Sequence, residues 1–226
     1  TKAADIVSMQ HALVHRAVDG KGVWQSEQIF IGHHKLVVAP EQGAEQMPYE
    51  EGDLVITADA GIHNREELFT KLGIDRGQRI TYPDSMLILA AYRKWGAMCL
   101  EHLTGEFTFA IFNKCSVALF CATDHIGFRP FYYYDTPDVF VFSSEIKGIL
   151  AVKKTPGVFN EDALIEYYYG QSDKTRTYNK EVFALCGGNT LQLNQGNLAI
   201  QKYWTPQPTG RYRFTKDADW AECLRD

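Results

Sequence analysis

The sequence lacks a surplus of positive charge, and this argues against one broad class of partner. It carries 23 Lys and Arg against 28 Asp and Glu, and the basic residues are scattered among the acidic ones. Proteins that bind nucleic acid gather Lys and Arg on one face, where these side chains neutralise phosphates. We therefore expect no nucleic-acid partner.

Long apolar runs are also missing. No stretch reaches the ~20 apolar residues that a membrane-spanning helix needs, and the opening residues 1–5 contain no apolar signal core. The sequence thus predicts a cytoplasmic protein with no membrane partner. Because no initiating methionine stands first, we also expect further residues upstream of Thr1.

Cysteine is too sparse and too dispersed for a disulfide framework or a zinc site. The five cysteines are odd in number and form no CxxC pair, and the seven histidines show no ligand constellation with nearby carboxylates. We expect no metal site and interpret the histidines as turn and core hydrogen-bonding groups. The residues concerned are Cys99, Cys115, Cys121, Cys186 and Cys223, and His11, His15, His33, His34, His63, His102 and His125.

What the chain does contain is enough apolar sequence for one sizeable core, since 45% of its 226 residues are hydrophobic. Strand runs that are apolar on both faces, at 107–112 and 117–121, predict a central sheet covered on both sides. Helical spacing predicts helices at 3–15, 65–72, 84–95, 98–103, 144–151 and 161–169. β-rich runs predict further strands at 22–24, 28–31, 35–38, 54–57, 131–134, 139–142, 188–193 and 198–202.

Local signals mark where these elements begin and end. Asn64 with Glu67 has the pattern of a capping box, and Gly73 ends the same helix. Residues 194–197 predict a four-residue hairpin loop. We expect one domain over 1–204, followed over 205–226 by a linker and the first helix of a separate domain, because 205–210 has linker composition.

Six motifs follow one another along the chain: HRAVDG (15–20), GHHKL (32–36), ADAGIHNREEL (58–68), GEFTFA (105–110), ATDHIGFRPFYY (122–133) and FSSEIK (142–147). Together, in this order and spacing, they resemble the class II glutamine amidotransferase domain of the asparagine synthetase family. The resemblance covers roughly residues 3–204. It implies an α+β fold, a four-layer αββα sandwich of two antiparallel sheets between helices.

The resemblance also implies acyl transfer from glutamine. In that family a cysteine at the mature N-terminus attacks the substrate amide, its own α-amine acts as the base, and groups after a strand hold the oxyanion. Ammonia then passes to a C-terminal synthetase domain, which binds ATP and Mg²⁺. No catalytic residue of this kind is present in the chain, because Thr1 leads into polar Lys2 and a predicted helix rather than a buried strand.

The glutamine-pocket positions carry altered residues. Lys35 replaces the arginine that clamps the substrate carboxylate, which removes the planar two-point contact. Asp59, Ala60 and Gly61 replace Asn-Gly-Glu, so an acceptor-only carboxylate stands where an oxyanion donor is needed. Asp84 matches the aspartate that contacts the substrate amine, although it also fits a helix N-cap.

Other conspicuous residues have simpler interpretations. Asp124 and Arg129 match family positions, and we interpret them as an ion pair or as turn contacts. The tyrosine runs 132–134 and 167–169 are interpreted as sheet and helix packing.

The 58–68 motif most resembles an asparagine-synthetase-like branch associated with lasso-peptide cyclisation, in which a peptide amine replaces ammonia. We thus expect part of an ATP-dependent ligase with a degenerate glutaminase site, and no catalytic activity in this fragment alone. Two alternatives remain open: a working glutamine-hydrolysing asparagine synthetase whose cysteine lies outside this chain, and a non-catalytic scaffold or peptide-recognition domain. The sequence leaves a homodimer open as well.

Overall fold

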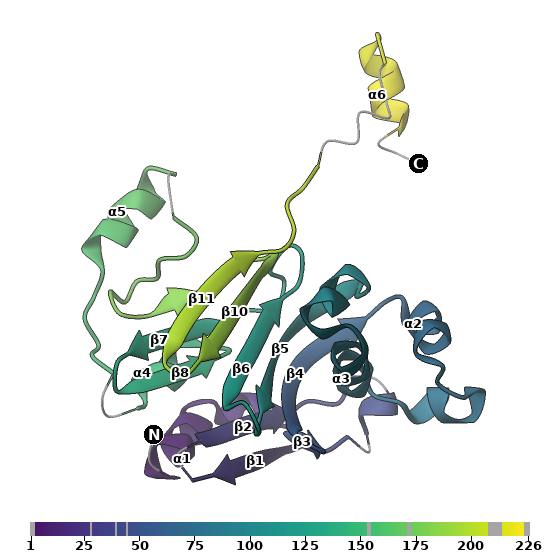
Figure 1. The fold of residues 1–226 in the computed structure, drawn as a ribbon. Helices are drawn as coiled ribbons and strands as arrows, with labels where there is room; N and C mark the ends of the chain where they lie inside the picture. The colour runs from purple at the N-terminus through teal and green to yellow at the C-terminus, as the bar shows by residue number, and fades with distance from the viewer. Residues whose placement is uncertain are drawn as a thin grey trace.

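The computed structural model describes residues 3–27, 29–38, 40–43, 45–152, 155–170, 173–207 and 214–223 (Figure 1). Its α-helices are α1 (Ala3–Ala12), α2 (Arg65–Leu72), α3 (Asp84–Trp95), α4 (Ile146–Leu150), α5 (Glu161–Tyr168) and α6 (Asp217–Cys223). Four 3₁₀ helices accompany them: η1 (Val14–Arg16), η2 (Pro40–Gln42), η3 (Arg76–Thr81) and η4 (Gly96–Glu101). The strands are β1 (Gly20–Ser26), β2 (Ile29–Lys35), β3 (Tyr49–Glu51), β4 (Leu54–Ile62), β5 (Gly105–Asn113), β6 (Ala118–Thr123), β7 (Tyr132–Thr136), β8 (Val139–Ser143), β9 (Phe183–Ala184), β10 (Asn189–Asn194) and β11 (Asn197–Lys202).

The largest sheet has six antiparallel strands in the order β11-β10-β6-β5-β4-β3. Its centre is the pair β4 and β5, which stay in register from Leu54 opposite Asn113 to Ile62 opposite Gly105. Side chains alternate between the two faces of such a strand. Each central strand therefore sends one set of residues toward helices and the other set toward a second layer of strands.

Helices α2 and α3, with η4, cover one face of this sheet (Figure 1). Ile56 of β4 and Phe107 of β5 are fully buried there against Leu87 and Ile88 of α3. The pattern of apolar residues along 84–95 produces this contact, because positions three and four apart share one side of a helix. This apolar cluster forms the main core of the domain.

The opposite face packs on two smaller antiparallel sheets, β1-β2 and β8-β7-β9. Phe131 and Tyr133 pack against Ala110 and Cys121 of the large sheet, while Ile31 of β2 packs against Val55 and Phe112. Outside this second layer lie α1 and α4, which contribute Met9 and Ile149 to a further apolar cluster with Val141. The predicted four-layer α+β sandwich is confirmed, with its second strand layer divided in two.

Several predicted elements are confirmed, some with the predicted bounds and others with shifted ones. Helices α2 and α3 have the predicted limits, and Gly73 ends α2 in a left-handed conformation with φ 73°. The predicted helix 98–103 is instead the 3₁₀ helix η4. The predicted hairpin loop is tighter than expected, because Asn194 and Asn197 pair and only Gln195 and Gly196, both at positive φ, turn the chain.

Three local predictions are wrong. Residues 36–38 continue no strand, since β2 ends at Lys35. The strand predicted at 54–57 instead runs on to Ile62, because β5 supplies backbone partners along its whole length. Asn64 does not cap α2 with its side chain, which instead bonds the backbone of His102 and Thr104 and so ties the start of α2 to the turn before β5.

The end of the chain is described only in part. Trp204 follows β11 and its N–H donates to the carbonyl of Gly188 at 3.2 Å. The predicted final helix is present as α6, whereas residues 224–226, Thr1, Gln28 and half of the predicted linker, 208–210, lie outside the described residues. Among the described helices, none has the length and apolar composition to cross a membrane.

Candidate functional site

A cavity of about 1250 Å³ opens within the second layer, between the sheet β1-β2 and the sheet β8-β7-β9. Strands β2 and β8 border it, β4 and β5 form its base, and α1 lies beside it. In the described residues neither β2 nor β8 has a second strand partner. The edges of two strands, with their hydrogen-bonding groups, therefore face this cavity.

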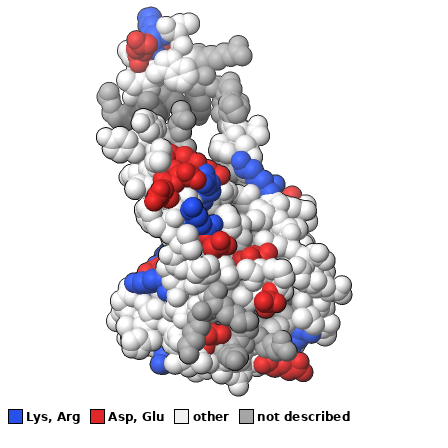
Figure 2. Space-filling model, turned by 90° about the vertical axis from the view of Figure 1, so that its left-hand side faces the viewer, with Lys and Arg blue, Asp and Glu red and all other residues white. Residues whose placement is uncertain are grey.

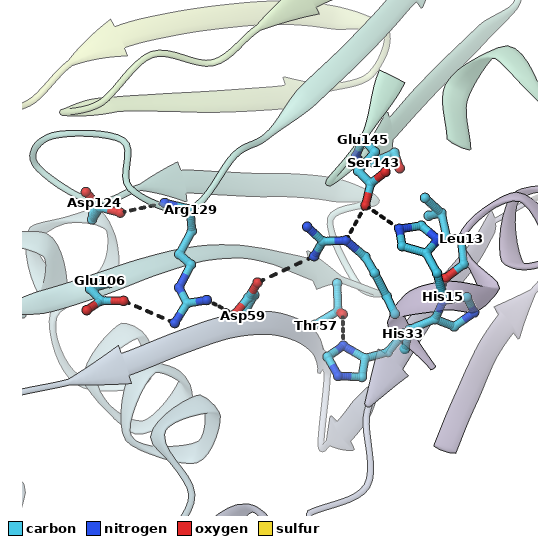
Figure 3. Close-up of polar contacts among 12 residues, drawn as sticks. Leu13, His15, His33, Thr57, Asp59, Glu106, Asp124, Arg129, Ser143 and Glu145 are labelled. Carbon is cyan, nitrogen blue, oxygen red and sulfur yellow. Dashed lines mark hydrogen bonds and ion pairs between the residues drawn. The ribbon is translucent and has the colours of Figure 1, made fainter. Parts of the chain in front are cut away.

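A row of alternating charges crosses the base of the cavity (Figure 3). At its centre the Asp59 carboxylate of β4 meets the Arg129 guanidinium, with 3.3 Å between Oδ1 and Nη1. Arg129 also binds Glu106 of β5, with 3.1 Å between Nη2 and Oε2. One arginine therefore compensates two carboxylates that come from adjacent strands.

The row continues toward the outer layer that holds α1 and α4 (Figure 3). The other oxygen of Asp59 lies 4.0 Å from Nη1 of Arg16, which belongs to η1. Arg16 in turn donates through Nε to Glu145 at 2.5 Å, and His15 and Lys147 lie 2.9 and 3.0 Å from the same carboxylate. We call His15, Glu145, Arg16, Asp59, Arg129 and Glu106 the charged row.

The pKa of Glu145 reflects these neighbours. Partial burial raises the pKa, but hydrogen bonds from Arg16, Lys147 and His15 together lower it to about 2. Glu145 is therefore a carboxylate at neutral pH, and it links the turn before α4 to the end of η1.

The loop after β6 places Arg129 in this row. Asp124 is 1% exposed, and its carboxylate accepts hydrogen bonds from four consecutive backbone N–H groups, 126–129, at 2.8–3.2 Å. It also accepts one from the N–H of Phe107 at 3.3 Å. The predicted turn contacts of Asp124 are confirmed, whereas an ion pair with Arg129 is wrong, because that guanidinium reaches Asp59 and Glu106.

His33 of β2 lies beside the charged row (Figure 3). Its Nδ1 is 3.1 Å from Oγ1 of Thr57 on β4, so it links the two strand layers. Burial lowers the pKa of His33 to about 4, with smaller contributions from the positive charges of His34 and Lys35. The imidazole is therefore neutral at physiological pH.

Lys35, the first predicted pocket residue, lies at the end of β2 and borders the cavity. Its ammonium donates to the carbonyls of Gly43 and Glu45, both at 2.7 Å. Since those residues follow η2, the side chain secures the segment between β2 and β3. A second group from the same segment, the Glu45 carboxylate, bonds the Ser85 hydroxyl, and burial raises its pKa.

The remaining pocket residues lie on β4 and α3. Ala60 and Gly61 are strand residues opposite Phe107 and Glu106, although the predicted strand ends at residue 57. Asp84 is the first residue of α3 and does not cap it, since the N-cap is Pro83. Its carboxylate accepts from the N–H of Ile62 at 2.9 Å and binds Arg65. Lys35, Asp59, Ala60 and Asp84 all border the cavity.

Sequence reasoning missed the row itself, although its signal was present. Arg16, Glu106 and Glu145 fall inside the motifs that carry the family resemblance, yet the motifs alone suggest no role for them, and His15 is expected only as a hydrogen-bonding group. Each of five motifs contributes at least one residue to the charged row. A charged residue recurring in separate motifs could have indicated one shared site.

No set of three His, Cys, Asp or Glu side chains within the described residues could hold a metal ion. All five cysteines are free thiols. Burial raises the pKa of the Cys99 thiol to about 12 and that of Cys121 still further, so neither is a ready nucleophile.

The layers define the class of protein. The glutamine phosphoribosylpyrophosphate amidotransferase of Bacillus subtilis aligns with a TM-score of 0.62 and 15% identity, over 91% of this chain and 48% of that one. A second structure, an allosteric regulatory enzyme of purine biosynthesis, aligns with a TM-score of 0.63 at the same identity. The fold is that of N-terminal-nucleophile-type glutamine amidotransferases.

The chain belongs to the glutamine amidotransferase domain family, which matches residues 1–204. A putative glutamine-hydrolysing asparagine synthetase 2 of Methanocaldococcus jannaschii is 31% identical over 88% of this chain and 43% of that protein. Asparagine synthetase 3 of Bacillus subtilis is 29% identical over 87% of this chain and 33% of that protein. The domain is thus of the asparagine synthetase type, and the chain spans less than half the length of these curated relatives.

Proposed function

We propose that this domain is part of an ATP-dependent amide-forming ligase of the asparagine synthetase type and that its glutaminase site is degenerate. One observation carries the second half of the proposal. The three ionisable side chains at the glutamine-pocket positions, Lys35, Asp59 and Asp84, are each engaged by other groups of the protein. A glutamine molecule would have to displace these contacts.

Asp59 is the most consequential of the three. An oxyanion needs a hydrogen-bond donor, and an ionised carboxylate only accepts. The pairing with Arg129 and Arg16 compensates its charge but leaves it without a proton to donate. Arg129 is itself shared between Asp59 and Glu106, which fixes its direction along the sheet. The position therefore favours a structural ion pair over transition-state stabilisation.

Lys35 and Asp84 support the same conclusion at the two ends of the substrate. Two of the three ammonium protons of Lys35 point to backbone carbonyls, so its positive charge is partly directed away from a substrate carboxylate. Asp84 is largely buried and already holds Arg65 and a strand N–H, which leaves little capacity for a substrate amine.

In the ligase as a whole, a following synthetase domain would use ATP and Mg²⁺ to activate a carboxylate, and an amine would then form the amide. We propose a peptide amine as that nucleophile, on the likeness of the 58–68 motif to lasso-peptide cyclases. Because such an amine makes ammonia unnecessary, it is consistent with an idle glutaminase site. ATP–pyrophosphate exchange by the full-length protein tests the activation step, and its absence with every peptide and aspartate tried would contradict the proposal.

A working glutaminase is the alternative, and two observations favour it. The similar curated proteins are named as glutamine-hydrolysing, and the cavity exceeds the ~300–1,000 Å³ of ordinary small-molecule pockets. A strand from residues upstream of Thr1 would fit between the open edges of β2 and β8. In this alternative that strand would bring a terminal cysteine into the cavity.

Substitution of Asp59 separates the two functions. In the full-length protein, Asp59→Asn restores an amide donor at the oxyanion position. If an upstream cysteine is present, we expect glutamine hydrolysis to rise by roughly ten- to a hundred-fold, less than a full oxyanion donor contributes because Lys35 and Asp84 remain engaged. Glutamate release from glutamine is the measurement.

A matched control is Asp75→Asn, which makes the same chemical change at an exposed position remote from the cavity. It should leave glutamate release unchanged. Rapid hydrolysis by the unaltered protein, together with a loss of activity in Asp59→Asn, would reject the degenerate site and favour the working glutaminase.

A further inference from the structure

Helix α5 carries an apolar surface that the domain leaves uncovered. Of the eight residues of α5 only Ala163 is buried. Tyr167, Tyr168 and the adjacent Tyr169 are 65%, 85% and 75% exposed, and Leu164, Ile165 and Tyr178 also lie on the surface. We call these six residues the tyrosine face. The packing role predicted for 167–169 from the sequence is confirmed for Tyr167, whose ring meets that of Tyr178, whereas Tyr168 and Tyr169 contact only each other's rings at the surface.

The tyrosine face is organised rather than loose. Asn160 caps α5 by accepting from the N–H of Ala163, and its amide donates to the carbonyl of Thr177. The rings of Tyr167 and Tyr178 meet edge to face at 6.2 Å, which holds the helix against the segment that follows it. A helix this short gains little stability from its own hydrogen bonds. The Asn160 cap and the ring contact of Tyr167 therefore hold α5 and its aromatic side chains in place.

Charged groups border this face. Arg176 binds Glu166 and lies 3.7 Å from Asp162. Figure 2, in which the left-hand side of Figure 1 faces the viewer, shows acidic and basic side chains gathered together near the middle of the molecule. Exposed tyrosines with a polar border are the usual composition of a protein–protein contact, and patches of this kind mark interaction sites.

From this arrangement we propose that the tyrosine face docks the domain that follows this one in the same polypeptide. The inference rests on the proposed function, which requires such a domain. The matched portion covers only 43% and 33% of the length of the two curated relatives, so both proteins extend well beyond it. A tethered domain is present at an effective concentration of about millimolar, which lets a modest surface suffice.

The connection that leads out of the core toward the next domain is short. The core ends where Tyr203 and Trp204 donate to the carbonyl of Gly188, after β11. In Figure 1, α5 and β11 lie in the same half of the molecule, away from α2 and α3. The residues between Trp204 and α6 can span at most ~40 Å when extended, which limits how far the next domain can lie from the end of the core.

Carbene footprinting of the full-length protein, read by mass spectrometry, tests the proposal. Ile80 is the internal reference, because it is 81% exposed and lies on η3, on the α2 side of the molecule. We expect Tyr168 to be labelled roughly five-fold less than Ile80 after correction for side-chain reactivity, since a docked ring loses most of its accessible surface. Equal labelling would overturn the proposal, and protection that disappears on dilution would assign the face to a second copy and overturn it as well.

A pair of variants sharpens the result. Tyr168→Glu places a charge at the centre of the face and should restore labelling of Tyr167 and Tyr169. Ile80→Glu, which introduces the same residue at a similarly exposed position, should leave their protection intact. Restoration by both variants, or by neither, would contradict a contact at Tyr168.

ATP–pyrophosphate exchange by the same samples distinguishes the two proposals. Exchange with an unprotected tyrosine face would reject the docking surface and retain the proposed ligase. Protection without exchange would retain the docking surface and reject the ligase function.

Discussion

The two faces of the six-stranded sheet come from the same strands and behave in opposite ways. Toward α2 and α3, strands β4 and β5 present residues such as Ile56 and Phe107, which are completely buried among apolar neighbours. Toward the second layer, β4 presents Thr57 and Asp59, which border a large cavity. One face is closed by its own packing, and the other depends on partners from distant parts of the chain.

The difference shows how stability and function are divided in this domain. Apolar contacts are short-ranged and nondirectional, so the helix-facing core is secured by many interchangeable neighbours. The charged row instead needs particular donors and acceptors, and these come from five separate segments of the chain. Truncating a core side chain should therefore destabilise the whole fold. Changing a residue of the charged row, or Asp124 in the loop that places Arg129, should act locally and lower the free energy of unfolding by less.

The largest expected effect is in the apolar core. Ile88→Ala on α3 deletes a fully buried side chain and should lower the free energy of unfolding by about 2–5 kcal/mol. Ile80→Ala, the same change at an exposed site, should stay within about 0.5 kcal/mol of the unaltered protein. Urea unfolding measures both, and similar losses for the two variants would contradict the assignment of this core.

A smaller effect is expected at the support of the charged row. Asp124→Asn keeps the shape of the side chain but removes the charge that five backbone N–H groups share, which should cost about 2 kcal/mol. Asp75→Asn, at an exposed position, should cost almost nothing. Urea unfolding again gives the values, and a loss below about 0.5 kcal/mol for Asp124→Asn would show that the loop does not depend on its carboxylate.

The third effect appears only on acidification. In the unfolded state the His33 imidazole has its usual pKa of ~6.5, whereas burial in the folded state lowers this pKa to about 4. Between these values the unfolded state binds more protons, so stability is lost as pH falls through this window. From pH 7 to pH 5 the loss attributable to His33 should be about 2 kcal/mol.

Unfolding at the two pH values, compared between the unaltered protein and His33→Asn, isolates this contribution. The variant should lose less stability over the same interval, because Asn has no proton to gain. An identical loss in both proteins would mean that His33 is not held neutral by burial.

Much of the fold could be predicted because its signals are local. The bounds of α2 and α3 follow from apolar spacing and from Gly73, and the motif order identifies the family. The extension of β4 to Ile62 could not be predicted, since it depends on β5 pairing more than forty residues later. The role of Asn64 was missed for the same reason, because its partners His102 and Thr104 are remote in sequence.

The sequence by itself determined the fold class, the main helices and the altered identities of Lys35, Asp59 and Asp84. Only the tertiary structure decided what those side chains bind: Lys35 two carbonyls, Asp59 two arginines, and Asp84 an arginine and a strand N–H. Local propensity and apolar periodicity act over a few residues and can be read along the chain. Ion pairs form between groups that folding brings within a few ångströms, so their partners are set by the packing of the four layers.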